Sequence, residues 1–200
     1  MTEVHLGRLL PASLHQAIAD ELPQRLDFYE NWLTSEGLRD GSIGLAPMTA
    51  VVGFLRTEGL AYDRVMTRAG TLAADWWLAT VSPWRRQSML WLPRALRTRA
   101  ALRLAAEMVR SVSRISRVST RLRGKTARVE VKSSVFCTVR ESQPTPLCAF
   151  YTAMTVRALS HFGIAASARV EQCHAMSGKA CVLALDLGAS GAVPAPAMAA

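Results

Sequence analysis

The hydrophobic pattern of this chain changes character near residue 113, and that change limits the folds open to it. Before this point apolar residues recur every three or four positions, as at Leu14, Ile18 and Leu22, which predicts amphipathic helices. After it, β-branched and polar residues alternate, as in half-buried strands. The order is helices first, then strand, strand, helix, strand, strand. It predicts an α+β fold in which N-terminal helices pack on a small antiparallel sheet.

We expect residues 1–112 to be the helical part of a single domain. Pro23 should kink or split the first helix, because a proline inside a helix removes a hydrogen bond and clashes with the preceding turn. A glycine-rich connector, 36–44, should follow it. The helices are expected at residues 13–33, 47–58, 62–80, 83–91 and 94–112.

Residues 113–187 should form the sheet and one further helix. Arg123-Gly124-Lys125 lies between two alternating segments and predicts a hairpin turn. Pro146 should open a helix that ends at Gly163, and two short strands, 168–173 and 181–187, should flank a turn. Residues 188–200 carry no charge and no periodicity, so we expect a disordered tail.

The positive charge is concentrated in one segment. The net charge is +9, and residues 85–128 hold 13 arginines and lysines against one acid, Glu107. Such a segment attracts anionic partners, although arginines interleaved with leucine and alanine also form the solvated face of a helix. No aromatic residue lies between Trp91 and Phe136, so the stacking surface of a single-strand binder is missing there. We therefore expect a protein contact through segment 85–128 rather than specific nucleic-acid binding.

The sequence favours a cytoplasmic protein without integral membrane association. Four cysteines in 200 residues are too sparse for a secreted disulfide scaffold. The N-terminus lacks the apolar run of a signal peptide. The uncharged stretches 45–55 and 142–156 are shorter than the roughly 20 residues of a spanning helix.

All the cysteines lie in the last third of the chain. Glu171 and Cys173 are two apart on a predicted strand, so their side chains should point to one face. Cys181 begins the next strand and Cys148 lies in the first turn of the preceding helix, so three thiols and a carboxylate could meet around zinc. The alternative is that these are buried free cysteines. Cys137, beside Phe136, is expected to be one such structural thiol.

Residues 146–181 resemble the end of the 4-vinyl-reductase-type, hydrocarbon-binding domain family. The positions that carry the resemblance are Cys148, Phe150, Gly163, Glu171, Cys173, Gly178 and Cys181. The resemblance implies the ligand-binding fold of the NO-signalling and Golgi-transport type. Bacteriochlorophyll vinyl-reductase accessory proteins, phenol-sensor domains and TRAPP trafficking subunits share that fold.

The resemblance also implies a zinc site. In the sensor branch zinc is held by a cysteine, a glutamate and two more cysteines, which correspond here to Cys148, Glu171, Cys173 and Cys181. The family usually places its glutamate three residues before the cysteine, whereas here the spacing is two. If Glu171 cannot reach the metal, the alternatives are that His174 or water completes the site, or that the site is empty.

The family's ligand lies in an apolar pocket between the helices and the sheet. Tryptophan and methionine at helical spacing are alternatively core or dimer-interface residues. The candidates for the pocket lining in this chain are Trp76, Trp77, Trp84, Met89, Trp91, Phe150, Tyr151 and Met154.

No catalytic motif appears in the sequence, neither a glycine-rich phosphate loop nor HExxH nor GxSxG. Without such a motif, the family resemblance implies a carrier, sensor or accessory protein for a hydrophobic aromatic or tetrapyrrole ligand, with a role in bacteriochlorophyll biosynthesis as its specific form. The alternatives are a vinyl reductase that uses an external reductant and a dimerising interaction module. A homodimer is expected.

Overall fold

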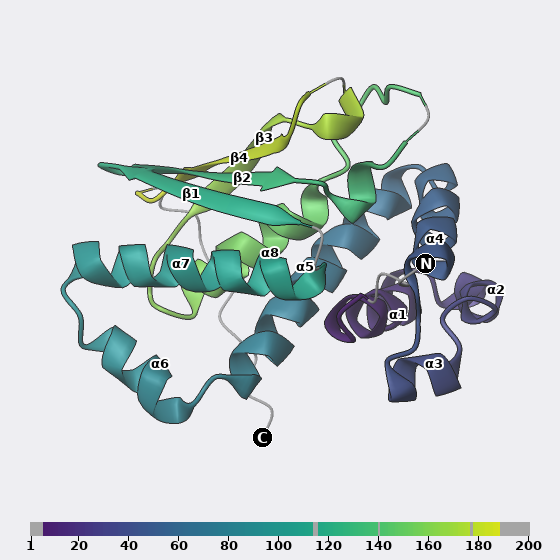
Figure 1. Ribbon diagram of the computed structural model, residues 1–200, viewed down its shortest axis with the longest axis horizontal. Coiled ribbons are helices and arrows are strands. Elements are labelled where there is room, and N and C mark those ends of the chain that lie inside the picture. Colours follow the sequence, from purple (N-terminus) through teal and green to yellow (C-terminus); the bar gives the residue numbers. More distant parts are fainter. Residues whose placement is uncertain (1–5, 114–115, 140, 177, 189–200) are drawn as a thin grey trace.

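The computed structural model describes residues 6–113, 116–139, 141–176 and 178–188 (Figure 1). Its sheet has four antiparallel strands in the order β1-β2-β4-β3. The strands β1 and β2 are joined by a two-residue turn whose first residue, Gly124, has a φ of 56°. That backbone region favours glycine and suits a hairpin turn. The strands are β1 (Arg117–Arg123), β2 (Thr126–Lys132), β3 (Ser167–Gln172) and β4 (Cys181–Asp186).

Three helices lie on one face of the sheet (Figure 1): α7 and α8 contact its strands, and α5 packs against α8. The α+β architecture with helices packed on a small antiparallel sheet is therefore confirmed. The other face of the sheet carries no helix in this view. The three helices are α5 (Leu60–Thr80), α7 (Arg94–Val112) and α8 (Ala149–Ser160).

The remaining helices lie to the side of this core (Figure 1). Four of them come from the first 57 residues: α1 and α4 contact α5, and α2 and α3 lie further out. Helix α6 forms a corner between α5 and α7. These helices are α1 (Leu9–Glu21), α2 (Leu26–Glu30), α3 (Ser35–Asp40), α4 (Leu45–Thr57) and α6 (Pro83–Leu90).

The expected break at Pro23 is confirmed, since a 3-10 turn, Pro23–Arg25, separates α1 from α2. The expected glycine-rich connector at 36–44 is wrong, because most of it forms α3. The hydroxyl of Thr34 accepts a hydrogen bond from the Gly37 amide and so caps α3. Gly41, with a φ of 70°, ends the helix.

The core lies between the sheet and the three covering helices. The inward residues of β2 are Ala127, Val129 and Val131, and all are buried. Helices α5 and α8 approach so closely at Gly70 that an added Cβ would overlap the carbonyl oxygen of Phe150. This close contact fixes the position of α8 relative to α5. It thereby also positions Cys148, which directly precedes α8.

None of the helices within the described residues combines the length and the apolar character needed to cross a membrane. The tail expected at 188–200 lies outside the described residues from position 189 onward.

Candidate metal centre

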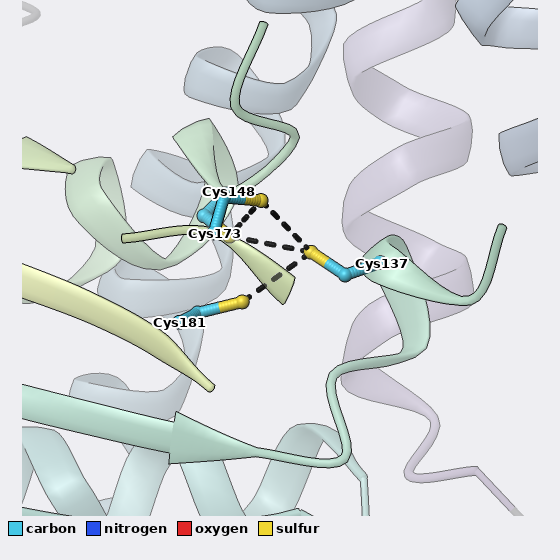
Figure 2. A group of neighbouring side chains, drawn as sticks. All are labelled: Cys137, Cys148, Cys173 and Cys181. Carbon is cyan, nitrogen blue, oxygen red and sulfur yellow. Dashed lines mark hydrogen bonds between the residues drawn. The ribbon is translucent and has the colours of Figure 1, made fainter. Parts of the chain in front are cut away.

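Four cysteines from four separate segments meet beneath one end of the sheet (Figure 2). Cys137 ends a 3-10 turn, Val135–Cys137, and Cys148 directly precedes α8. Cys173 follows β3, and Cys181 is the first residue of β4. All four side chains are buried and none forms a disulfide.

The four sulfur atoms lie within 4.8 Å of one another. The Sγ atom of Cys137 is 3.3 Å from that of Cys148, 3.5 Å from that of Cys173 and 3.4 Å from that of Cys181. A tetrahedron with zinc–sulfur bonds of ~2.3 Å has sulfur–sulfur edges of about 3.8 Å. Outward movements of a few tenths of an ångström would therefore admit the ion.

The backbone around Cys173 supports the cluster. The amide of Leu147 donates a hydrogen bond to the Cys173 Sγ atom at 3.4 Å. The amide of Gly178 donates to the Cys173 carbonyl oxygen at 3.1 Å. A Cβ at position 178 would lie only 2.7 Å from that oxygen, so the turn requires glycine. Hydrogen bonds from the backbone to a ligand sulfur, or to the residue that carries it, typically orient thiolate ligands around a metal.

The thiols strongly influence one another's ionisation. Hydrogen bonds from Cys137, Cys148 and Cys181 lower the pKa of Cys173, against the opposing effect of burial. The hydrogen bond to Cys137 raises the pKa of Cys148, and burial adds to this rise. Neighbouring buried thiolates repel one another, so all four can ionise together only if a cation compensates the charge.

Glu171 is not among the residues brought together, which corrects the predicted ligand set. A bulge in β3 between Val170 and Gln172 breaks the two-residue alternation, so Glu171 faces outward whereas Cys173 is buried. The Glu171 carboxylate lies 2.9 Å from Arg128 and 3.7 Å from Arg169 on the outer face of the sheet. Cys137 occupies the fourth corner instead.

Sequence reasoning missed Cys137 because the residue follows β2 in a short turn without a strand or helix pattern. The available signal was the shared location of all four cysteines in the last third of the chain. His174, the predicted substitute ligand, is also directed elsewhere. Its Nδ1 atom lies 2.8 Å from the carbonyl oxygen of Gly178, and its side chain is exposed.

The predicted ligand-binding residues fall into two groups. Phe150, Tyr151 and Met154 on α8 are fully buried in the core. The ring of Phe136 packs against both aromatic residues, with centroid distances of 4.9 Å to Phe150 and 5.1 Å to Tyr151. This part of the predicted pocket is packed by side chains of the protein itself.

The second group lies nearer the surface. Trp84 and Trp91 are 81% and 75% exposed, and Trp76 is 37% exposed. Trp77 is partly buried against the core, and only Met89 is buried. The structure therefore does not bring the eight candidates together into one lining.

Two clefts open on the outer side of the sheet. One, of about 540 Å³, lies over Cys173 between Pro146 and Lys179. The other, of about 450 Å³, lies across the strands and is lined by Arg121, Arg128 and Arg169. Both volumes are within the range of small-molecule sites, roughly 300–1,000 Å³.

No family model matches this chain and no curated protein matches it. Among solved structures, an H-NOX protein mutant from K. algicida in its Fe(II) unliganded form has a TM-score of 0.59 and 11% identity. That match covers 92% of this chain and 98% of the other. An H-NOX protein from S. oneidensis in the Fe(II)NO ligation state has a TM-score of 0.55 and 11% identity, covering 92% and 100%.

A third similarity is to the phenol-responsive sensory domain of the transcription activator PoxR with phenol. It has a TM-score of 0.48 and 13% identity, and covers 72% of this chain and 74% of the other. Identities this low establish architecture alone. The chain therefore shares the fold of the H-NOX proteins.

Proposed function

We propose that this protein is a small-molecule-binding domain of the sensor, carrier or accessory type, braced by a structural zinc ion. The single observation that carries the proposal is the meeting of four buried sulfur atoms within 4.8 Å. Tetrahedral sets of four sulfurs are typical of zinc or iron–sulfur centres. A zinc site with four protein ligands has no open position and is structural.

The origin of the four thiolates explains what the metal would do. Cys137 and Cys148 flank the loop before α8, and Cys173 and Cys181 flank the turn between β3 and β4. One ion bound to all four would tie this loop and this turn to the end of the sheet. The metal would then hold these C-terminal elements together.

The described histidines do not favour an interior iron site like the Fe(II) forms named for the H-NOX structures. His15 lies 3.0 Å from Glu30, His161 lies 2.7 Å from Asp75, and both pairs are near the surface. His174 is exposed. No histidine among the described residues is buried in the core, so the thiols are the metal ligands that this structure supports.

Metal content per chain tests the proposal. Wild-type protein should contain about one zinc, and Cys137→Ser and Cys173→Ser should contain little, because each removes one of four ligands. Glu171→Gln is the matched control and should keep its zinc, since the carboxylate pairs with Arg128. If the protein instead contains iron and shows visible charge-transfer absorption, the four thiolates hold an iron–sulfur centre and not zinc. Absence of metal in anaerobically prepared wild type would reject the site.

Two buried hydroxyls support a ligand between the helices and the sheet. Tyr151 and Thr155 lie one turn apart on α8. The Thr155 hydroxyl has no hydrogen-bond partner among the described residues, and the Tyr151 hydroxyl has only the Ser116 and Ser134 side chains close to it. A buried polar group without a partner costs roughly 1–3 kcal/mol. A bound molecule with an apolar body and one polar group would satisfy such a site once the rings of Phe136 and Phe150, which pack there, move aside. This chemistry fits the aromatic or tetrapyrrole ligand implied by the family resemblance.

A thermal-shift screen with phenols, aromatic hydrocarbons and a free-base porphyrin tests this part of the proposal. A ligand that stabilises the wild type should stabilise Tyr151→Phe less, because that variant lacks the hydroxyl. Equal stabilisation of both proteins would place the ligand elsewhere. A role in bacteriochlorophyll biosynthesis requires binding of a vinyl-bearing chlorophyllide, and turnover with an added reductant would instead favour the reductase alternative.

A further inference from the structure

Two tryptophans stand out from the surface at the corner formed by α6. Trp84 is 81% exposed and Trp91 is 75% exposed. Leu96 is 49% exposed and Leu90 is 39% exposed, and these two flank the turn between α6 and α7. We call these four residues the corner patch. Large apolar side chains gathered on one exposed element indicate an interaction site.

The helix geometry aims both tryptophans in one direction. Trp84 and Trp91 are seven residues apart, which is close to two full turns. Met89 faces the opposite way and is buried, so it anchors the inner side of α6. Figure 1 shows α6 at the edge of the molecule, away from the sheet. The large exposure of both rings shows that the tryptophans project outward into solvent.

The charge around the corner patch is of one sign. Residues 76–106 contain six arginines and no acid. Among the described residues only Arg85 of these six has a carboxylate partner, at 3.1 Å from Glu107. Arg99 and Arg103 are exposed on α7. A surface on which five of six arginines have no carboxylate partner among the described residues, beside protruding tryptophans, is complementary to a layer of negative charge.

Two arginines near the patch also have unused donors. The Nε–H groups of Arg86 and Arg97 are shielded from solvent and have no acceptor among the described residues. Arg86 lines a cleft of about 260 Å³ between α6 and the end of α8, together with Leu90 and His161. A phosphate group at this cleft would supply an acceptor for a guanidinium.

We infer that the corner patch and its surrounding arginines dock this protein peripherally onto an anionic lipid surface. Tryptophan is enriched at the membrane–water interface because its ring is apolar and its N–H is polar. Basic residues near such a surface contribute about 1 kcal/mol each. A lipid surface suits side chains that protrude singly, whereas a protein partner would favour a closely packed patch with recessed pockets.

Vesicle co-sedimentation tests the inference with the full chain. The vesicles are phosphatidylcholine alone, or phosphatidylcholine with about 30 mol % phosphatidylglycerol. Wild type should bind the anionic vesicles, bind them less as salt rises, and leave the neutral vesicles largely unbound. Trp84→Ser with Trp91→Ser should weaken binding about tenfold or more. Arg99→Gln with Arg103→Gln should weaken it about tenfold.

Matched controls separate the corner from the rest of the surface. Leu60→Ser removes an apolar side chain that is 86% exposed at the far end of α5, about 30 Å away by the rise of a 21-residue helix. Arg117→Gln with Arg121→Gln removes two exposed charges from β1. Both should bind within about twofold of wild type. Circular dichroism checks that every variant is folded.

Three results would overturn the inference. The first is that the wild-type protein does not bind anionic vesicles at physiological salt. The second is equal loss of binding in the corner variants and their controls, which would mean diffuse electrostatics. The third is self-association that disappears in the double tryptophan variant while vesicles stay unbound, which would make the patch a protein interface.

Discussion

Arg157 on α8 holds both carboxylate oxygens of Asp75 on α5, with Nε–Oδ1 and Nη2–Oδ2 distances of 2.7 and 3.1 Å. His161, one turn further along, contacts the same carboxylate at 2.7 Å. The pair joins two helices that pack closely together. Bidentate pairs of this kind are stronger than single hydrogen bonds between neutral groups.

Asp75→Asn should lower the free energy of unfolding at pH 7 by about 1–2 kcal/mol. Burial favours the neutral acid, but hydrogen bonds from Arg157 and His161 outweigh it and hold the pKa of Asp75 below 3.8. The contribution is therefore fully present above pH 3.8 and is lost as pH falls through the folded-state pKa. Urea unfolding of both proteins at pH 7 and at about pH 2.5 measures the difference, which should shrink at the lower pH. A constant difference would contradict this assignment.

Removing the metal should lower the free energy of unfolding by about 3 kcal/mol or more, because only the folded chain brings the four thiols together. Urea unfolding before and after treatment with a chelator, under reducing conditions, measures the change. Zinc added back should restore it in wild type and not in Cys137→Ser. Superimposable curves with and without metal would show that the cluster is packed without an ion.

Gly70→Ala should destabilise the protein by roughly 1–3 kcal/mol. A methyl group there meets the Phe150 carbonyl oxygen and the Ala153 side chain, so α5 and α8 would have to move apart. Gly53→Ala on α4 is the matched control, because nothing lies within 4 Å of its added Cβ. The control should be stabilised by about 0.5–1 kcal/mol through helix propensity. Thermal unfolding of both variants is the measurement, and similar shifts would count against the close helix contact.

Tyr62→Phe should speed the release of bound zinc. The buried Tyr62 hydroxyl donates a hydrogen bond at 3.0 Å to the carbonyl oxygen of Leu147, whose amide donates to Cys173. Losing this bond should also cost about 1 kcal/mol of stability. Metal transfer to a colorimetric chelator gives the release rate, with Tyr29→Phe as a control far from the cysteines in sequence. If zinc is released from Tyr62→Phe at the wild-type rate, the Tyr62 hydrogen bond does not stabilise the metal site.

The sequence predicted most of the architecture because its signals there are local. The hairpin around Gly124 and the break at Pro23 each depend on a few adjacent residues. The helix α3 was missed because apolar residues do not recur in it every three or four positions. Thr34 caps the start of the helix, and Gly41, which the sequence analysis placed in the 36–44 connector, ends it.

The metal ligands were only partly predictable. The errors come from structural features that the alternation of side chains along a regular strand does not predict. A one-residue bulge reverses the face of Glu171 relative to Cys173. Cys137 reaches the cluster through a tertiary arrangement of a turn and a helix start. The tryptophans gave a further error, because periodicity shows that Trp84 and Trp91 share a side of α6 but not that Met89 takes the inner one.

The position of β4 has a consequence for biosynthesis. It is the last of the described strands in the sequence, yet it lies between β2 and β3 and pairs with both. While the chain is still emerging from the ribosome, β3 has no neighbour and Cys181 is absent from the thiol cluster. The sheet and the cysteine cluster are thus completed in one late event, after the helices of the first half are already free to pack. A nascent chain stalled before residue 181 would expose an open sheet edge and three unassembled thiols to the cell's quality-control machinery.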